Sequence, residues 1–456
     1  MNHNQMSALE RRSTVGLSGI FALRMLGMFI ILPVFSLYAA QLPGGQSHTL
    51  IGVALGAYGI TQAILQIPFG WASDRYGRKR MLYWGLGIFA LGSFIAAGAH
   101  DIWWVIIGRV VQGAGAVSGV VIAMTADLTR DEHRTKAMAI IGMTIGVTFA
   151  LSLVVSSWLA GLVGIPGIFA LTGFLALAAM LIVYGVIPTP QASRARVAAG
   201  SEFLAVLRNP ELVRLNLGIF VLHGVLMALF VVVPFALRNT GLASEHHWHV
   251  YLPVMFGAFV LMAPAIIFGE MKIGAKPMLV SSIAVLLIAQ VLLGFAQQNF
   301  WGLVVALTVF FIAFNVLEAS LPSMVSRVAP AGTKGTATGV YSSSQFLGLA
   351  VGAVTGGAVS QHFGGASVFM FTGAATLLWL VVALGMRPLL AVRVTTYALP
   401  ELPDQKAQQL ADALGDLPGV REAVVLAKDR VAHLKVEKSG FDEPAVLRLI
   451  SALREG

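Results

Sequence analysis

The chain has 456 residues, of which 57% are hydrophobic and only 11% are charged, and its net charge is +9. An ordinary soluble protein carries about a quarter charged residues, so this composition excludes a water-soluble globule as the whole molecule. The chain contains no cysteine, which excludes disulfides, thiolate metal sites and cysteine nucleophiles.

The charges divide the chain near residue 390. Residues 391–456 hold nine Lys/Arg and ten Asp/Glu, which leaves 21 basic and 11 acidic residues for the first 390. A long apolar, basic body therefore precedes a short, charged and nearly neutral tail. The basic residues of the body lie in short clusters between apolar runs, a pattern typical of membrane orientation rather than of nucleic-acid binding.

Apolar runs long enough to cross a bilayer occur twelve times in the sequence. A bilayer core of about 30 Å needs about 20 apolar residues in helix, because only helices and closed barrels satisfy backbone polar groups in lipid. The runs lie near 15–38, 49–72, 81–99, 102–127, 137–161 and 166–187, and then near 213–236, 248–270, 277–296, 300–325, 335–359 and 364–386. We therefore expect an all-α membrane protein with twelve transmembrane helices.

The second six runs repeat the first six at an offset of about 198 residues. The repeat reaches single residues, since Gly77, Lys79, Met81 and Leu82 recur as Gly274, Lys276, Met278 and Leu279. Such a parallel repeat is typical of transporters, in which two similar bundles move about a site between them. We expect six-helix bundles at 1–187 and 213–387.

Basic residues gather in the loops on one side of the predicted bundles. Those loops hold eighteen Lys/Arg, whereas the loops of the other side hold only Arg238. By the positive-inside rule, both termini and the linker at 188–212 are cytoplasmic. The linker contains an amphipathic stretch that predicts a surface helix, formed by Phe203, Leu204, Leu207 and Leu212.

The loop after the second run reads G-W-A-S-D-R-Y-G-R-K-R from Gly70 to Arg80. It resembles the signature loop of the major facilitator superfamily, G-x-x-x-D-R-x-G-R-K-R. In the fourth run, R-V-V-Q-G-A-G at 109–115 resembles the R-x-x-Q-G-x-G motif of that superfamily's proton-driven drug exporters. The resemblance covers about 390 residues. It implies the two-bundle major facilitator fold and a drug/proton antiporter-like protein, multi-pass in the inner membrane of a bacterium.

The resemblance also implies that the signature loop is a conformational latch. Asp74 would lie at the N-terminus of the eleventh run, near 335–339, where a helix dipole favours an anion by about 0.3 to 2 kcal/mol. Arg78 would pair with Asp127, and these contacts would bridge the bundles when the cytoplasmic side is closed. Gly70 and Gly77 belong to the same latch. Membrane orientation alone explains the remaining basic residues of the loop, but it gives no reason for Asp74.

Four ionisable side chains lie well inside the runs, and each costs at least about 2.5 to 3.5 kcal/mol at bilayer depth. Glu318 is a proton-carrier candidate because burial disfavours the charged form of a carboxyl group. His223 is another because histidine titrates near neutral pH. The alternative is that both only hydrogen-bond to neighbouring helices, with Asn315 one turn from Glu318 as a companion.

Arg24 and Arg109 are the two basic members of this set. An arginine stays charged in proteins, so each must pair with an acid or bind an anionic or carbonyl group. Arg24 is a candidate for tuning a buried acid, and the resemblance links Arg109 to proton translocation. The alternative for both is a structural hydrogen bond to backbone carbonyls.

The sequence specifies the substrate contacts less well than the ionisable groups. The candidates, which are suited to an amphipathic cavity, are Asn315, Phe29, Tyr58 and Tyr341.

The sequence has no Gly-Lys-Ser/Thr phosphate motif. We therefore expect a secondary transporter that exports a small amphipathic, drug-like compound in exchange for protons by alternating access. An uptake symporter, a passive facilitator and a non-transporting membrane sensor remain alternatives. No enzyme activity, cofactor or metal is expected, and the partners are lipid, protons and a small molecule.

Glycine spacings predict close approaches between helices. The relevant sets are Gly52/Gly56, Gly115/Gly119, Gly142/Gly146 and Gly348/Gly352/Gly356.

Residues 393–456 predict the order strand, helix, strand, strand, helix, which is typical of a small α+β ferredoxin-like domain. The run from Leu417 to Val420 is similar to heavy-metal-associated domains, which bind metal through two cysteines. Because this chain has no cysteine, we expect a cytoplasmic regulatory domain that acts through a small ligand or self-association. An inert appendage is the alternative.

Overall fold

The computed structural model describes residues 6–189, 200–330, 333–387, 392–400, 402–427, 430–437 and 441–455. These residues form two compact units, one comprising 1–273 and 277–386 and the other comprising 387–456 with 274–276. The middle of the predicted linker, 190–199, lies outside the described residues.

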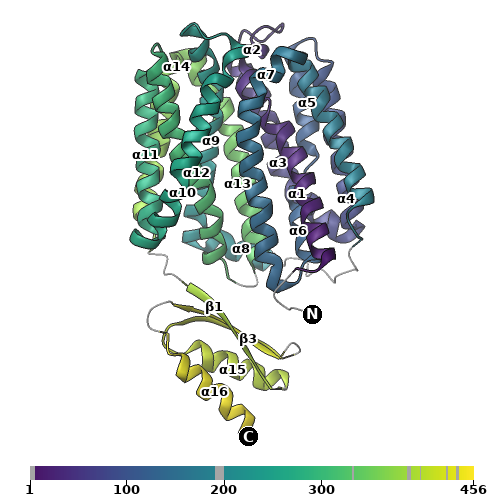
Figure 1. The fold of residues 1–456 in the computed structure, drawn as a ribbon, viewed down its shortest axis with the longest axis vertical. Coiled ribbons are helices and arrows are strands. Elements are labelled where there is room, and N and C mark those ends of the chain that lie inside the picture. The colour runs from purple at the N-terminus through teal and green to yellow at the C-terminus, as the bar shows by residue number, and fades with distance from the viewer. Residues whose placement is uncertain are drawn as a thin grey trace. The chain divides into compact units, whose positions relative to one another are not determined.

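The larger unit is a bundle of helices (Figure 1). Its first half contains α1 (Ala8–Phe29), α2 (Leu32–Ala39), α3 (His48–Tyr76), α4 (Arg78–Ala97), α5 (Ile102–Ala114), α6 (Ser118–Leu128) and α7 (Asp131–Gly185). Its second half contains α9 (Pro210–Asn239), η1 (Ser244–His246), α10 (Trp248–Ile273), α11 (Ala275–Phe295), α12 (Phe300–Val328), α13 (Lys334–Phe363) and α14 (Gly365–Leu384). The short helix α8 (Gly200–Arg208) lies within the predicted linker and leaves Phe203, Leu204 and Leu207 exposed.

Local sequence determines where several helices begin. Ser7 and Glu10 form a capping box at α1, while Asp101, Asn209 and Asn299 cap α5, α9 and α12 with side-chain oxygens. These oxygens satisfy amide groups that the first turn of a helix leaves without an intrahelical partner.

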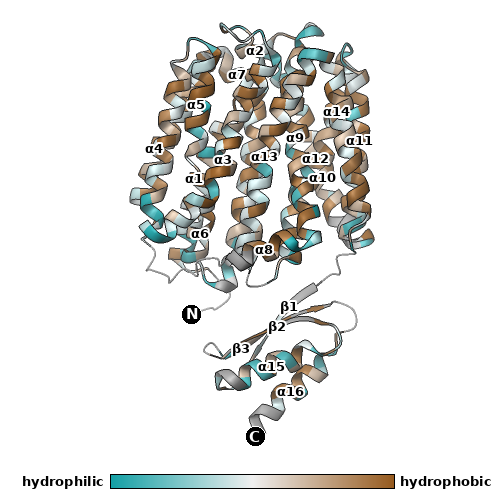
Figure 2. Cartoon of the chain, turned by 180° about the vertical axis from the view of Figure 1, so that it is seen from behind, coloured by the Kyte–Doolittle hydropathy of each residue, from teal (hydrophilic) through white to brown (hydrophobic). Residues whose placement is uncertain are grey.

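Within the described residues, ten helical segments are long and apolar enough to cross a membrane. The twelve predicted runs differ from this number for two reasons. The fifth and sixth runs are two helices that carry one label, α7, and meet at Gly164, where the backbone is not helical (φ 67°, ψ 174°), a conformation that only glycine adopts easily. The eleventh run, α13, is rich in glycine and serine and is not among the ten. Figure 2 shows α13 in paler colours than α11.

Helix α13 lies between α3 and α9, and glycines bring all three backbones close together (Figure 1). A Cβ atom added to Gly352 would overlap the backbone of Gly224 in α9, and one added to Gly52 would overlap the carbonyl oxygen of Ala353. The close approaches predicted from these glycine sets are therefore confirmed. Such small-residue contacts drive helix association in lipid, where burial of apolar surface gives no advantage.

The prediction for Gly142 and Gly146 is wrong. A Cβ added to either residue would meet no atom of the described structure within 4 Å. Their neighbours Met143 and Val147 are 71% and 59% exposed, so this face of α7 is not covered by another helix. The spacing alone does not distinguish a packed face from an open one.

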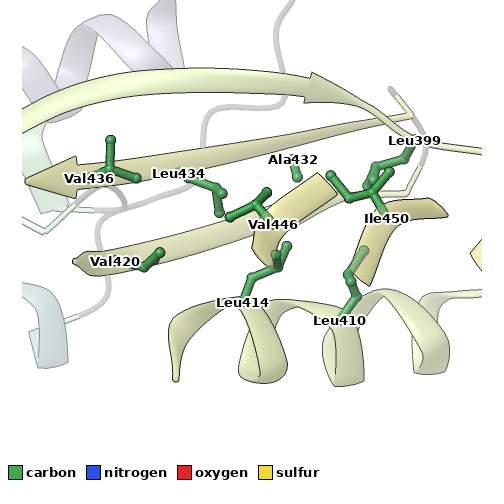
Figure 3. Packing of buried hydrophobic residues seen from close by; sticks show 9 residues of the cluster. All are labelled: Leu399, Leu410, Leu414, Val420, Ala432, Leu434, Val436, Val446 and Ile450. Atoms are coloured by element: carbon green, nitrogen blue, oxygen red, sulfur yellow. The ribbon is translucent and has the colours of Figure 1, made fainter. Parts of the chain in front are cut away.

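The smaller unit has the predicted order of elements, namely β1 (Val392–Ala398), α15 (Asp404–Gly415), β2 (Val420–Leu426), β3 (Val431–Glu437) and α16 (Glu443–Glu455). The strands form an antiparallel sheet in the order β1-β3-β2. Side chains from the strands and both helices meet in one apolar core (Figure 3), made up of Leu399, Leu410, Leu414, Val420, Ala432, Leu434, Val436, Val446 and Ile450.

Candidate functional site

The buried acid of the second half belongs to a polar cluster formed by three helices. Glu318 of α12, His223 of α9 and Gln345 of α13 come together where these helices pack. Gln345 Nε2 lies 2.8 Å from His223 Nε2 and 3.5 Å from Glu318 Oε1. Glu318 Oε2 is 3.7 Å from His223 Nε2. One amide group therefore bridges the carboxyl group and the imidazole.

The geometry of this cluster assigns a tautomer to the imidazole. A glutamine Nε2 is a donor only, so the His223 Nε2 that faces it must be the unprotonated acceptor nitrogen. The ring proton then lies on Nδ1. The His223 side chain is 4% exposed, whereas that of Glu318 is 31% exposed. Glu318 is therefore the less enclosed member of the cluster, although its Oε2 atom is itself buried without a hydrogen-bond partner in the described structure.

Asn315, the companion that its spacing suggested for Glu318, is buried on α12, and its Nδ2 has no hydrogen-bond partner in the described structure. Gln345 takes that place instead. Sequence reasoning did not single out Gln345 because an uncharged amide in an apolar run carries no titration signal. Tyr341, one turn away on α13, is buried with an unpartnered hydroxyl group.

Aromatic side chains connect this cluster to the first half of the unit. The His223 ring lies 5.8 Å from the Phe314 ring, which lies 5.8 Å from Phe149 of α7. Phe149 in turn packs edge-on against Phe29 of α1 at 4.9 Å. Of these aromatic residues, Phe29 was a predicted substrate contact, whereas Phe149 was not. The row of rings passes from one half to the other.

The first half has its own polar cluster around Arg24 of α1. The guanidinium group donates to Tyr58 Oη at 2.6 Å, to Gln62 Oε1 at 2.7 Å and to the hydroxyl group of Ser118. Arg24 is 1% exposed. Three helices, α1, α3 and α6, are therefore joined by one buried cation.

Arg109 of α5 lies on the other side of Tyr58. Its Cζ atom is 4.9 Å from the centre of the Tyr58 ring, and its Nη1 donates to Gln112 Oε1 at 2.7 Å. Gln112 Nε2 donates in turn to the hydroxyl group of Ser93. Among the described residues no carboxylate pairs with Arg24 or Arg109, and neither guanidinium group donates to a backbone carbonyl.

In the described structure, the hydrogen-bond partners of Arg24 and Arg109 are therefore neutral side chains. Tyr58 is common to the two arginines, because its hydroxyl group accepts from Arg24 and its ring faces Arg109. The ring also contacts Phe346 of α13 at 6.3 Å, and Phe346 follows Gln345 in the chain. Tyr58 thus connects the arginine cluster of the first half with the helix that carries the amide of the second.

The signature loop forms a second charged site at the end of α3. Arg78 pairs with Asp74, donates from Nε to Asp127 Oδ2 at 2.9 Å and donates to the Ser73 hydroxyl group. Gly77 has φ +98°, which explains why glycine occupies the turn between α3 and α4. The structure brings Asp74, Arg78 and Asp127 together. Gly70, at the start of the loop, has open space around it.

The predicted contact of Asp74 with the start of α13 is not among the interactions of the described residues. Asp74 pairs with Arg78, and Gly335 and Gly339 of α13 have no neighbouring atom within 4 Å of an added Cβ. On the side of the signature loop, the described residues therefore show none of the contacts with α13 that the latch predicts.

At the other end the same two helices touch. A Cβ on Gly56 would lie 2.8 Å from the carbonyl oxygen of Ala350, and one on Gly59 would lie 2.7 Å from that of Phe346. The Ser36 hydroxyl group of α2 donates to the Phe230 carbonyl oxygen of α9 at 2.8 Å. The structure is thus closed at the end remote from the signature loop.

Comparisons with known proteins agree with this architecture. The family model of the Major Facilitator Superfamily matches residues 17–272 and 254–414. The chain is 41% identical over 442 residues to the inner membrane transport protein YajR of Escherichia coli, and the match covers 96% of each chain. It is 36% identical over 351 residues to an uncharacterized transporter of Buchnera aphidicola subsp. Acyrthosiphon pisum, covering 76% of this chain and 90% of that protein.

A solved structure supports the fold independently. A bacterial homologue of the human lysosomal transporter Spinster, in an inward-facing and occupied conformation, superposes with a TM-score of 0.67 and 15% identity. The match covers 83% of this chain and 96% of that one. The resemblance in the signature loop is therefore confirmed: this chain belongs to the Major Facilitator Superfamily and is a membrane transporter, not an enzyme.

Proposed function

We propose that this transporter is a proton-coupled exporter of a small amphipathic compound and that it works by alternating access. The observation that carries the proposal is the Glu318–Gln345–His223 cluster, in which a partly exposed acid lies 3.7 Å from a buried base. An intramembrane acid with a nearby base is typical of proton relays in transporters. The aromatic row from His223 to Phe29 supplies an apolar surface for cargo.

The proposed topology has twelve membrane spans with both termini on the cytoplasmic side of a bacterial inner membrane. The two parts of α7 on either side of Gly164 count as separate spans, and α13 is the eleventh. The clusters of Lys and Arg beside the signature loop support this orientation. The name of the YajR relative supports the choice of membrane.

Glu318 carries the proton in this proposal, and Gln345 controls its exchange with His223. When Glu318 is protonated, the cluster is neutral and tolerates burial. When Glu318 releases its proton, the Gln345 amide stabilises the carboxylate. Transfer to His223 Nε2 requires the amide to turn, because that nitrogen then becomes a donor. The proton is thus bound at Glu318 and the cargo along the aromatic row, and alternating access couples their opposite movements.

Arg24 and Arg109 hold Tyr58 between two fixed positive charges, and we assign them a role in coupling rather than in proton release. A charge that cannot be lost must be solvated in every state, and we assign to movement of Tyr58 against Phe346 the transmission of the state of one half to the other. We expect Arg24→Lys to reduce proton-driven flux about tenfold, because an ammonium group cannot reach Tyr58, Gln62 and Ser118 together. A flux assay in vesicles measures this effect, with Arg208→Lys in exposed α8 as the control.

The signature loop acts as the latch in this scheme, through the Asp74, Arg78 and Asp127 triad. The triad holds the ends of α3, α4 and α6 in place, so that Asp74 is ready to meet the N-terminus of α13 when the halves close at this end. Gly77 forms the turn between α3 and α4, and Gly70 lies in the last part of α3, where an added Cβ would meet no atom within 4 Å.

The latch predicts the result of an Asp127→Asn substitution. A partly exposed ion pair such as Arg78–Asp127 contributes little free energy. We therefore expect loss of the Asp127 charge to lower the outward-open population by up to about fivefold. Distances between cysteine-attached spin labels on the two halves measure this population. Lys79→Gln is the control, because topology alone accounts for that charge, and an equal effect of the two substitutions contradicts the latch.

The C-terminal unit is proposed to be a ferredoxin-like regulatory domain. Its sheet and two helices enclose one core, and a cavity of about 460 Å³ lies between β1 and α16, lined by Tyr397, Leu447 and Arg448 among others. Removal of 388–456 that leaves flux, stability and oligomeric state unchanged would exclude a regulatory role.

Proteoliposome flux tests the proposed function. The purified transporter is placed in vesicles with a pH-sensitive dye inside, a pH gradient is imposed, and a panel of amphipathic fluorescent compounds is added. We expect at least one compound to move opposite to protons. Movement with protons would indicate a symporter, movement without protons a facilitator, and no movement of any compound a sensor. Each of these three outcomes contradicts the proposal.

A further inference from the structure

The end of the transporter remote from the signature loop is held by the residue that begins α3. The backbone N–H of His48 donates to Gln361 Oε1 at 2.7 Å, and its ring Nδ1 lies 2.8 Å from the Ser360 hydroxyl group. The imidazole also stacks on Phe235, with ring centres 5.0 Å apart and planes inclined by 19°. Gln361 and Ser360 belong to α13, and Phe235 belongs to α9. All three partners therefore come from the opposite half.

The local sequence leaves His48 available for these contacts. The first amide groups of a helix have no partner within it, and the Ser47 side chain caps Leu50 rather than His48. The His48 amide is therefore free to bind across the interface. Gly357 allows the close approach, because an added Cβ there would overlap the His48 carbonyl oxygen. A side chain at 357 would push α13 away from the start of α3.

The two ends of the α3 and α13 pair are in opposite states. Around His48 the helices touch, whereas a Cβ added to Gly335 or Gly339 would meet no described atom within 4 Å. Alternating access requires these states to exchange, so the His48 contacts must break whenever the remote end opens. A ring stack and a side-chain hydrogen bond across a moving interface favour the state in which they are made, and only that state.

We propose that His48 is the gate residue of the end remote from the signature loop, and that its ring contacts with Ser360 and Phe235 set how often that end opens. The inference rests on the alternating-access part of the proposed function. It does not depend on which ion is coupled or on what the cargo is.

Spin-label distances across the gate test this inference in the full-length protein. The native chain has no cysteine, so Gln46→Cys and Asn239→Cys, both exposed and on different halves, give one defined pair. We expect His48→Ala to increase the long-distance population about three- to tenfold, the range for losing a net hydrogen bond and a ring contact. Ser360→Ala should shift the population in the same direction but less.

Two further variants separate gating from mere structural support. His48→Asn keeps a side-chain donor near Ser360 and should recover part of the closed population. His362→Ala is the matched control, since the His362 ring lies beside Phe363 of its own helix. A His48→Ala distance distribution identical to that of His362→Ala overturns the inference, and so does a fall in melting temperature without any change in distance. Absence of proton-driven flux in the wild-type protein contradicts the proposed function instead.

Discussion

In proteoliposomes, Glu318→Gln is expected to reduce proton-driven transport to the leak of protein-free vesicles. The substitution keeps the size of the side chain and an oxygen that accepts from Gln345, which lies 3.5 Å from Glu318 Oε1. It removes the only proton that this side chain can release. Because the coupled cycle needs that release on one side of the membrane, the gradient no longer drives the cargo. Dye-reported proton movement measures the loss directly.

A second measurement on the same variant separates coupling from folding. Exchange of labelled for unlabelled cargo without a pH gradient needs no net proton release, so it should continue in Glu318→Gln. Glu245→Gln is the matched control, because Glu245 lies exposed in η1 outside the cluster. Full proton-driven flux in Glu318→Gln removes this acid from the mechanism. Loss of both flux and exchange assigns it to structure or cargo binding instead.

The His223 side of the cluster follows from the same geometry. The Nε2 atom of His223 faces the Gln345 amide. A base whose acceptor nitrogen is already occupied takes a proton only when the amide turns away. In the proposed mechanism, Gln345 therefore controls proton exchange between Glu318 and His223, although it has no titratable proton of its own.

The sequence indicates which ionisable side chains lie inside the bundle, because an ionisable group in an apolar run has few explanations. Glu318, His223, Arg24 and Arg109 were each identified in this way, and the structure places them in two clusters, one in each half. Their partners were not predictable to the same extent. Gln345 and Gln62 are neutral amides, and which amide meets which charge depends on how three helices pack rather than on spacing within one.

Contacts between helices are also only partly predictable from the sequence. The glycine sets of α3 and α13 are packed and Gly142 of α7 is not, although the spacing is the same. Glycine permits close approach, but whether the approach occurs depends on how the neighbouring helix packs. The break at Gly164 is similar, since the sequence marks two runs there and the structure joins them through a single residue with positive φ.

The same difference between packed and open glycines predicts opposite effects of one substitution at two sites. Gly352→Ala places a methyl group into the backbone of Gly224 in α9. Backbone atoms cannot move aside as a side-chain end can, so we expect a destabilisation of about 1 to 3 kcal/mol, the usual cost of overpacking. Thermal unfolding of the purified protein measures this as a lower melting temperature.

Gly142→Ala is the control, because its added methyl group meets no described atom within 4 Å. Alanine is favoured over glycine inside a helix by roughly 0.5 to 1 kcal/mol, so this variant should be slightly more stable than the wild type. The two substitutions are chemically identical and differ only in what the new methyl group touches. Equal melting temperatures would show that α9 and α13 do not approach as closely as their glycines allow. The contact at these glycines would then have no part in holding Gln345 beside His223.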